Sequence, residues 1–201
     1  MFDLFNESEN KIFSIKKDSK AQKAELKKTL RQLNRDVNCQ EALKEIGGFP
    51  KKNEVTCFVS RGMSDAGSFL TAILEENEII NEAVIATWTI SKKNIEKILE
   101  NIDNGKIKKL IFLLNDGMLK TNNTKPIYAF LRLEFDKRKD LVVYNVANSH
   151  AKIQCYNCGE NYYTISGSAN WSENPRIENF VIINSESQYK FNKEWISLQM
   201  P

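Results

Sequence analysis

The sequence predicts an α/β fold in which a mostly parallel or mixed sheet is flanked by helices. After residue 50, short runs of β-branched and aromatic residues alternate with longer segments whose apolar residues recur every three or four positions. The run at 110–114, Leu-Ile-Phe-Leu-Leu, is apolar at every position, which is typical of a strand buried on both faces. Alternation of this kind favours a sheet covered by helices.

Taken in order, the predicted strands cover 55–59, 83–90, 110–114, 141–146, 162–165 and 180–183. Helices are predicted between them. Ser64 and Asp65 are candidate caps of the first, which runs through residue 74, and Ser91 is the candidate cap of the second. A third helix is predicted over 126–139. The polar stretch 155–161 is typical of a hairpin turn.

The segment before residue 50 differs from the rest in charge. Residues 11–35 hold 9 Lys/Arg against 2 Asp/Glu, although the net charge of the whole chain is only +3. Leucines at 26, 30 and 33 with Val37 share one face of a helix predicted over 19–37. Gly and Pro at 47–50 mark a boundary. We therefore expect a basic helical N-terminal extension at 1–49 and one domain at 50–201.

Several classes of protein are disfavoured by composition. The longest apolar run is strand-sized, so no membrane span is expected. The N-terminal residues lack a basic segment followed by an apolar core, and the four cysteines are too scattered for a disulfide framework. These features favour a cytoplasmic protein. Cys155 and Cys158 would need two further ligands to hold zinc, with Cys39 and Cys57 as the remaining cysteines; two free thiols are the favoured interpretation.

Candidate chemistry begins at the single histidine of the chain. His150 directly follows the predicted strand 141–146, and Lys152 lies two residues later, on the same side if the chain is extended. A polar pair at the end of a buried strand lies where α/β folds tend to place their sites. Alone, the pair is weak evidence, since a lone histidine is more often a structural residue and His-x-Lys is common by chance.

The residues downstream add to this pair. After the hairpin come Gly167-Ser168-Ala169-Asn170 and then Glu178-Asn179, which precede the last predicted strand. His-x-Lys, a hairpin, Gly-Ser-x-Asn and a Glu-Asn pair, in this order, resemble the signature of the phospholipase D superfamily. The resemblance covers roughly three quarters of the chain, from about residue 55 onward.

The resemblance implies a phosphodiesterase that needs no metal or other cofactor. His150 would attack phosphorus and form a phosphohistidine, while Lys152, Ser168 and Asn170 hold the phosphoryl oxygens. Gly167 would let the backbone approach the substrate closely, and Glu178 would accept a hydrogen bond from the other ring nitrogen of His150.

The family mechanism uses two histidines, and this chain has one in total. The resemblance therefore implies a homodimer whose active site lies on its two-fold axis. Two departures from the family pattern bear on activity: Asn157 stands where the family has an Asp, and the His150–Gly167 interval is longer by three residues. Glu160 is a candidate replacement for that Asp.

The favoured function is cleavage of nucleic acid, DNA rather than RNA, by an endonuclease-like enzyme from a bacterium or bacteriophage. Lys23, Lys27, Lys28 and Arg31 are candidate contacts to the phosphate backbone. Two alternatives stay open: a phospholipid phosphodiesterase, and a nucleic-acid-binding module of the same fold that has lost turnover.

Overall fold

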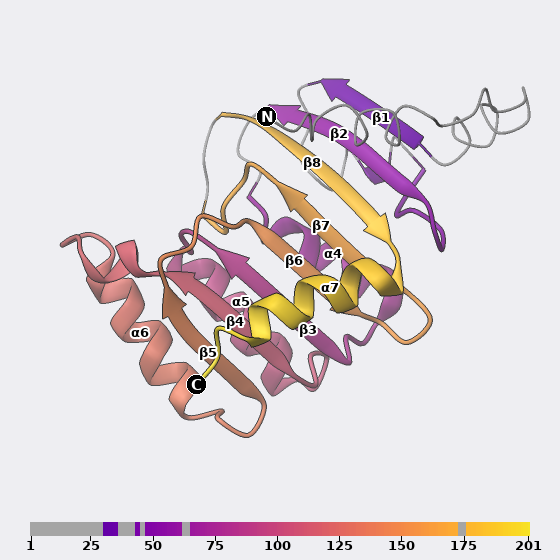
Figure 1. The fold of residues 1–201 in the computed structure, drawn as a ribbon. Helices are drawn as coiled ribbons and strands as arrows, with labels where there is room; N and C mark the ends of the chain where they lie inside the picture. Colours follow the sequence, from indigo (N-terminus) through magenta and orange to yellow (C-terminus); the bar gives the residue numbers. More distant parts are fainter. Residues whose placement is uncertain (1–29, 36–42, 45–46, 62–64, 173–175) are drawn as a thin grey trace, which may run out of the picture.

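The computed structural model describes residues 30–35, 43–44, 47–61, 65–172 and 176–201. Their framework is one mixed sheet of eight strands in the order β1-β2-β8-β7-β6-β3-β4-β5 (Figure 1). The strands are β1 Leu30–Arg35, β2 Val55–Arg61, β3 Glu82–Thr87, β4 Leu110–Asn115, β5 Val142–Ala147, β6 Ile153–Asn157, β7 Tyr162–Gly167 and β8 Ile177–Asn184. The predicted α/β fold with a mixed, helix-flanked sheet is confirmed.

The strand directions divide the sheet. β3, β4 and β5 are parallel to one another, as are β1 and β2. β6, β7 and β8 join these two groups through antiparallel pairs, with β6 beside β3 and β8 beside β2. β3 and β4 are buried at every position, as the continuous apolar run at 110–114 predicts.

Helices cover both faces of the sheet. α4 Ser68–Asn77, α5 Lys92–Asp103 and α6 Lys125–Asp136 lie on one face, and α7 Glu186–Ser197 crosses the other (Figure 1). A short 3-10 helix, η1 Asp116–Leu119, follows β4. The larger apolar core lies beneath α4–α6, and a smaller one, which includes Val84, Leu113 and Ile196, lies beneath α7.

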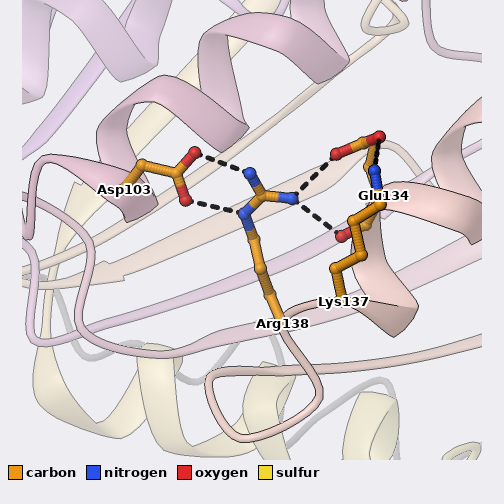
Figure 2. Close-up of polar contacts among 4 residues, drawn as sticks. All are labelled: Asp103, Glu134, Lys137 and Arg138. Atoms are coloured by element: carbon orange, nitrogen blue, oxygen red, sulfur yellow. Dashed lines mark hydrogen bonds and ion pairs between the residues drawn. The ribbon is translucent and has the colours of Figure 1, made fainter.

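An ion network joins the carboxyl ends of α5 and α6. The Arg138 guanidinium donates to both carboxylate oxygens of Asp103, at 2.7 and 2.6 Å, and to the Glu134 carboxylate at 3.0 Å (Figure 2). Lys137 also donates to Glu134, at 2.6 Å. These charges lie on the same side as the larger core, so the network orients the two helices whose apolar faces pack into that core.

The helix predicted over 19–37 is wrong where the structure describes it. Leu30–Arg35 forms β1, which pairs in parallel with β2 along six residues. The backbone groups on that side of β2 need partners, and a strand supplies them where a helix cannot. Residues 19–29 and 36–37 lie outside the described residues, and the boundary at residue 50 stays a prediction.

One other helix prediction needs correction, and one helix was missed. α4 begins at Ser68 with Gly67 as its cap residue, not at 64–65, although Asp65 accepts a hydrogen bond from the Ser68 backbone N–H at 3.1 Å. Ser91 does cap α5, by accepting from the Asn94 N–H. α7 was not predicted at all.

Candidate active site

The candidate site lies at one edge of the sheet. β3, β4 and β5 end there because they are parallel, and β6 and β8 begin there because they run the opposite way. β7 ends at the same edge with Gly167. Segments that are far apart in the sequence therefore lie close together at the edge formed by the carboxyl ends of the parallel strands.

A cavity of about 560 Å³ opens at this edge. Its lining combines residues that follow β3 and β5 with residues at the ends of β7 and β8. The lining residues are Trp88, His150, Lys152, Gly167, Ser168, Asn170, Arg176, Ile177 and Glu178. The structure thus brings together the five residues that the sequence predicted to be catalytic and Gly167, which it predicted to contact the substrate.

His150 lies in the connection between β5 and β6, with its side chain exposed. The preceding backbone is held by Asn115 at the end of β4, whose side-chain amide donates to the Ser149 carbonyl at 2.6 Å. Lys152 places its ammonium 3.3 Å from His150 Nδ1 and 3.2 Å from the His150 carbonyl oxygen. An ammonium can only donate, so Nδ1 is the acceptor in this contact.

The electrostatic setting of Lys152 is mixed. Partial burial lowers the pKa of the ammonium, and the nearby Glu178 carboxylate acts in the opposite direction. The net effect is a lowered pKa, because burial penalises the charged form more strongly. The hydrogen-bond partners of this ammonium, His150 Nδ1 and the His150 carbonyl oxygen, are uncharged, and a bound phosphate would give it a negatively charged one.

Gly167 and Ser168 lie where β7 meets β8. A Cβ on Gly167 would lie 2.1 Å from the Asn179 carbonyl oxygen, so only glycine fits at this backbone approach. Ser168 is fixed on both sides: its N–H donates to the Asn179 carbonyl, and its Oγ accepts from the Asn179 N–H, each at 3.1 Å.

Glu178 is buried, with an exposed fraction of 5%. Its carboxylate accepts a hydrogen bond from Ser168 Oγ. This differs from the expected partner, the ring of His150, whose Nδ1 lies instead beside Lys152. The difference follows from geometry, since Ser168 and Glu178 face each other across the β7–β8 junction.

Asn170 lines the cavity and carries an unused acceptor atom. Its side-chain Oδ1 is buried and has no hydrogen-bond partner among the described residues. Its backbone carbonyl is already occupied, accepting from Ala66 N–H at 2.9 Å. An unpartnered buried amide oxygen is costly to the fold. The phosphoryl oxygens of a substrate would need the amide N–H groups of Asn170, since only these can donate.

Three lining residues were missed by the sequence predictions: Trp88, Arg176 and Ile177. Trp88 follows β3, and its ring centroid lies 5.4 Å from that of His150. The signal available for Trp88 was its place directly after a buried strand, at the same edge as His150. Arg176 lies beside the Glu178-Asn179 pair and adds a second cation to the cavity wall.

The other predicted residues lie away from the cavity or outside the described part. Lys23, Lys27 and Lys28 are outside the described residues, and Arg31 is in β1 at the far edge of the sheet. Asn157 ends β6, about 13 Å of extended strand from Ile153. Its side chain accepts from Gly159 N–H at 3.0 Å and so shapes the hairpin turn, where Glu160 is exposed.

Cys155 and Cys158 do not form a pair of ligands on one surface. Cys155 is part of the smaller core beneath α7, whereas Cys158 packs against the larger core. Burial raises the pKa of each thiol to about 12, which disfavours the thiolate that zinc binds. Within the described residues no three His, Cys, Asp or Glu side chains gather as a metal site would need; Cys39 lies outside them.

No family model matches the chain, and no curated protein matches it. Among solved structures, it is similar to a phosphatidylserine synthase of Haemophilus influenzae, with a TM-score of 0.49 and 14% identity over 74% of this chain and 39% of that chain. For a polyphosphate kinase of Porphyromonas gingivalis the TM-score is 0.46 and the identity 12%, over 80% of this chain and 26% of that chain. For the archaeal chromatin protein TrmBL2, described as binding DNA, the TM-score is 0.41 and the identity 15%, over 96% of this chain and 64% of that chain.

The chain spans less than two thirds of the length of each of these three proteins. With TM-scores below 0.5, the likenesses identify no family for it. No helix among the described residues combines the length and the apolar character that crossing a membrane requires.

Proposed function

We propose that the chain is a metal-independent phosphodiesterase of the phospholipase D superfamily that cleaves nucleic acid. The observation that supports this most is the shared cavity. His150 and Lys152 come from the β5–β6 connection, Ser168 and Asn170 from the β7–β8 connection and Glu178 from the start of β8, and all five line one space. A phosphodiester needs a nucleophile, donors to its non-bridging oxygens and an acid for its leaving group. The cavity offers the first two within one chain.

In the proposed first step, a nitrogen of His150 bonds to phosphorus while the bond from phosphorus to the leaving oxygen breaks. A second imidazole protonates that oxygen. Water then attacks phosphorus, passes its proton to the second imidazole and breaks the phosphorus–nitrogen bond. Both histidines return to their starting states.

Substrate binding would also rearrange the contacts of the free chain. A phosphoryl oxygen is a stronger partner for Lys152 than the neutral His150 ring, so the ammonium would leave Nδ1. Nδ1 would then carry the ring proton and donate a hydrogen bond to Glu178, provided that Ser168 turns its hydroxyl to the phosphate. These exchanges account for the difference between the Glu178 contact in the free chain and the role proposed for it in catalysis.

The second imidazole must come from another copy, because the sequence holds one histidine. We propose a homodimer in which the exposed His150 side chains of both copies face one substrate phosphate across a two-fold axis. An exposed nucleophile on an open cavity suits this arrangement, since the second copy would close the site.

Nucleic acid is the favoured substrate because of charge. Lys152 and Arg176 line the cavity, and residues 11–35 add a surplus of Lys and Arg. A nucleic acid offers a phosphate every few ångströms to such cations. Phospholipid hydrolysis and binding without turnover are the alternatives that experiments must separate.

The decisive test is cleavage of plasmid and single-stranded DNA in EDTA by wild type and His150→Ala. We expect cleavage by wild type and a loss of at least a thousandfold in the variant, in line with removal of a catalytic nucleophile. Lys120→Gln, an exposed lysine outside the cavity, is the matched control and should cleave normally. Hydrolysis of phospholipid vesicles but not of DNA would favour the phospholipid phosphodiesterase. DNA binding without cleavage would favour the binding module.

The basic segment makes a separate prediction. Neutralising Lys23, Lys27, Lys28 and Arg31 to Gln should weaken DNA binding and reduce the slope of log affinity against log salt by about 0.7–0.9 for each DNA phosphate that is no longer neutralised. Neutralising Lys92, Lys93, Lys106 and Lys108 changes the net charge equally and serves as the control. An unchanged slope in the first variant would refute contact between this segment and the phosphate backbone.

A further inference from the structure

Trp88 is a large apolar side chain left exposed beside the proposed nucleophile. Its exposed fraction is 42%, whereas Thr87, directly before it, and Ile90, two residues after it, are each exposed by only 2%. Exposing an indole forgoes the stabilisation that its burial would give. The fold therefore presents this ring at the cavity wall without using it in a core.

The backbone around Trp88 is held in place by Trp171 and Ser172, which directly follow the Gly-Ser-x-Asn segment. The Thr87 hydroxyl donates to the Thr89 carbonyl at 3.0 Å, and that same carbonyl accepts from Trp171 N–H at 3.1 Å. The Thr89 and Ser172 hydroxyls are 2.8 Å apart, and Ser91 N–H donates to the Trp171 carbonyl at 2.9 Å. The indole is thus carried on a fixed connection, which lowers the entropy cost of its contact with a ligand.

The position of the ring relates it to the reacting phosphate. Its centroid is 5.4 Å from that of His150, with the planes inclined by 42°, and 6.0 Å from the Lys152 ammonium. A phosphate held by Lys152 and attacked by His150 would place its substituents against the indole. In nucleic acid, the flat substituent nearest a phosphate is a base.

The charges around the ring indicate which planar or cationic group fits. Aromatic rings also bind quaternary ammonium groups such as those of lipid headgroups. Here Lys152 and Arg176 line the same cavity, and two cations would repel a third. A neutral nucleobase meets no such repulsion, and every base has a π face that an indole can stack on.

We propose that Trp88 stacks on the base adjacent to the cleaved phosphodiester and that this contact makes single-stranded nucleic acid the preferred substrate. The inference rests on the proposed function and specifies its substrate. In a duplex both faces of a base are already covered by its neighbours, so only an unpaired or flipped base can use the platform.

The test compares two substrates of equal length and charge: a thymidine oligonucleotide and an oligomer whose sugars carry no base. Wild type should show a higher kcat/KM on the first. Trp88→Ala should narrow the ratio between the two substrates by about ten- to a hundredfold, and Trp88→Phe by less, since a smaller ring still stacks. The same variants should narrow the preference for single-stranded over double-stranded DNA. A ratio that Trp88→Ala leaves unchanged would overturn the proposal. If kcat/KM falls equally on both substrates, Trp88 acts through His150 or the dimer; if it falls on neither, Trp88 has no role in cleavage.

A binding measurement separates this inference from the proposed function. In His150→Ala, thymidine oligonucleotide should quench tryptophan fluorescence, and the quenching should disappear when Trp88 is also changed to Phe. The other two tryptophans are poor reporters of this event, since Trp171 is buried and Trp195 packs into the smaller core beneath α7. If wild type cleaves nothing but the quenching depends on Trp88, the enzyme proposal fails and the stacking site stands. Quenching that persists without Trp88 contradicts the stacking site.

Discussion

Gly167 lies at the junction of β7 and β8, where the chain passes from the sheet into the candidate site. The atom that a larger side chain would meet there is a backbone carbonyl oxygen, that of Asn179, and not the flexible end of a side chain. A substitution can therefore be accommodated only if the two strands separate. Ser168 and Glu178 lie next to this junction and would move with it.

Gly167→Ala should lower the free energy of unfolding by about 1–3 kcal/mol, as overpacking of a tight contact does. It should also reduce turnover, because the Ser168–Glu178 contact is displaced. Urea unfolding of the wild type and the variant measures the first effect. Ser166→Ala, one residue earlier on β7, is the control and should stay within about 0.5 kcal/mol of wild type. Equal stability of Gly167→Ala and wild type would show that the strands yield without cost.

α7 illustrates how one element is held to a sheet by both apolar and charged contacts. Ile196 and Tyr189 pack into the smaller core, and Glu82 of β3, exposed by 7%, lies beneath the helix. The Tyr189 hydroxyl donates to Glu82 at 2.5 Å, and the Lys193 ammonium also lies 2.5 Å from that carboxylate. Burial tends to raise the pKa of Glu82, but the contacts from Lys193 and Tyr189 together lower it.

Tyr189→Phe should cost about 1–2 kcal/mol of unfolding free energy near neutral pH, since it removes a hydrogen bond to a buried carboxylate. The folded-state pKa of Glu82 is lowered, so its contribution is complete above the unfolded value of 4.5 and is lost as pH falls below it. The difference between wild type and variant should therefore shrink in acid. Thermal unfolding across pH measures it, with exposed Phe191→Leu on the same helix as control. A pH-independent difference would exclude this role for Glu82.

The same elements show what the sequence could and could not predict. The strands at 110–114 and 162–165 and the Ser91 cap follow from local patterns and are confirmed. β1 could not be predicted from local patterns, because the leucine spacing in this segment suits a helix. Pairing with β2 is a tertiary effect that overrides this local preference. α7 follows β8 with a mixed surface of exposed Phe191 and buried Asn192, which weakens any helical period.

At the scale of the molecule, strand direction explains how distant residues reach one site. Order along the chain predicted the motif residues but not their neighbours, because Trp88 and Arg176 carry no motif and are placed only by the sheet. The partner of Glu178 was also beyond the sequence, since it depends on which side chains face each other across β7 and β8. The count of histidines, by contrast, needs no coordinates, and it makes the proposed active site a property of two chains.

The measurement that tests this most directly is the DNA cleavage rate of wild type mixed with His150→Ala and allowed to exchange subunits. If one site needs His150 from both copies, only pairs of two wild-type chains cleave, and at equal amounts these are about a quarter of all dimers. We predict that the activity of the mixture, at fixed total protein, falls to about a quarter of the wild-type value and follows the square of the wild-type fraction. Activity that falls only to about a half, in proportion to that fraction, would contradict a shared site.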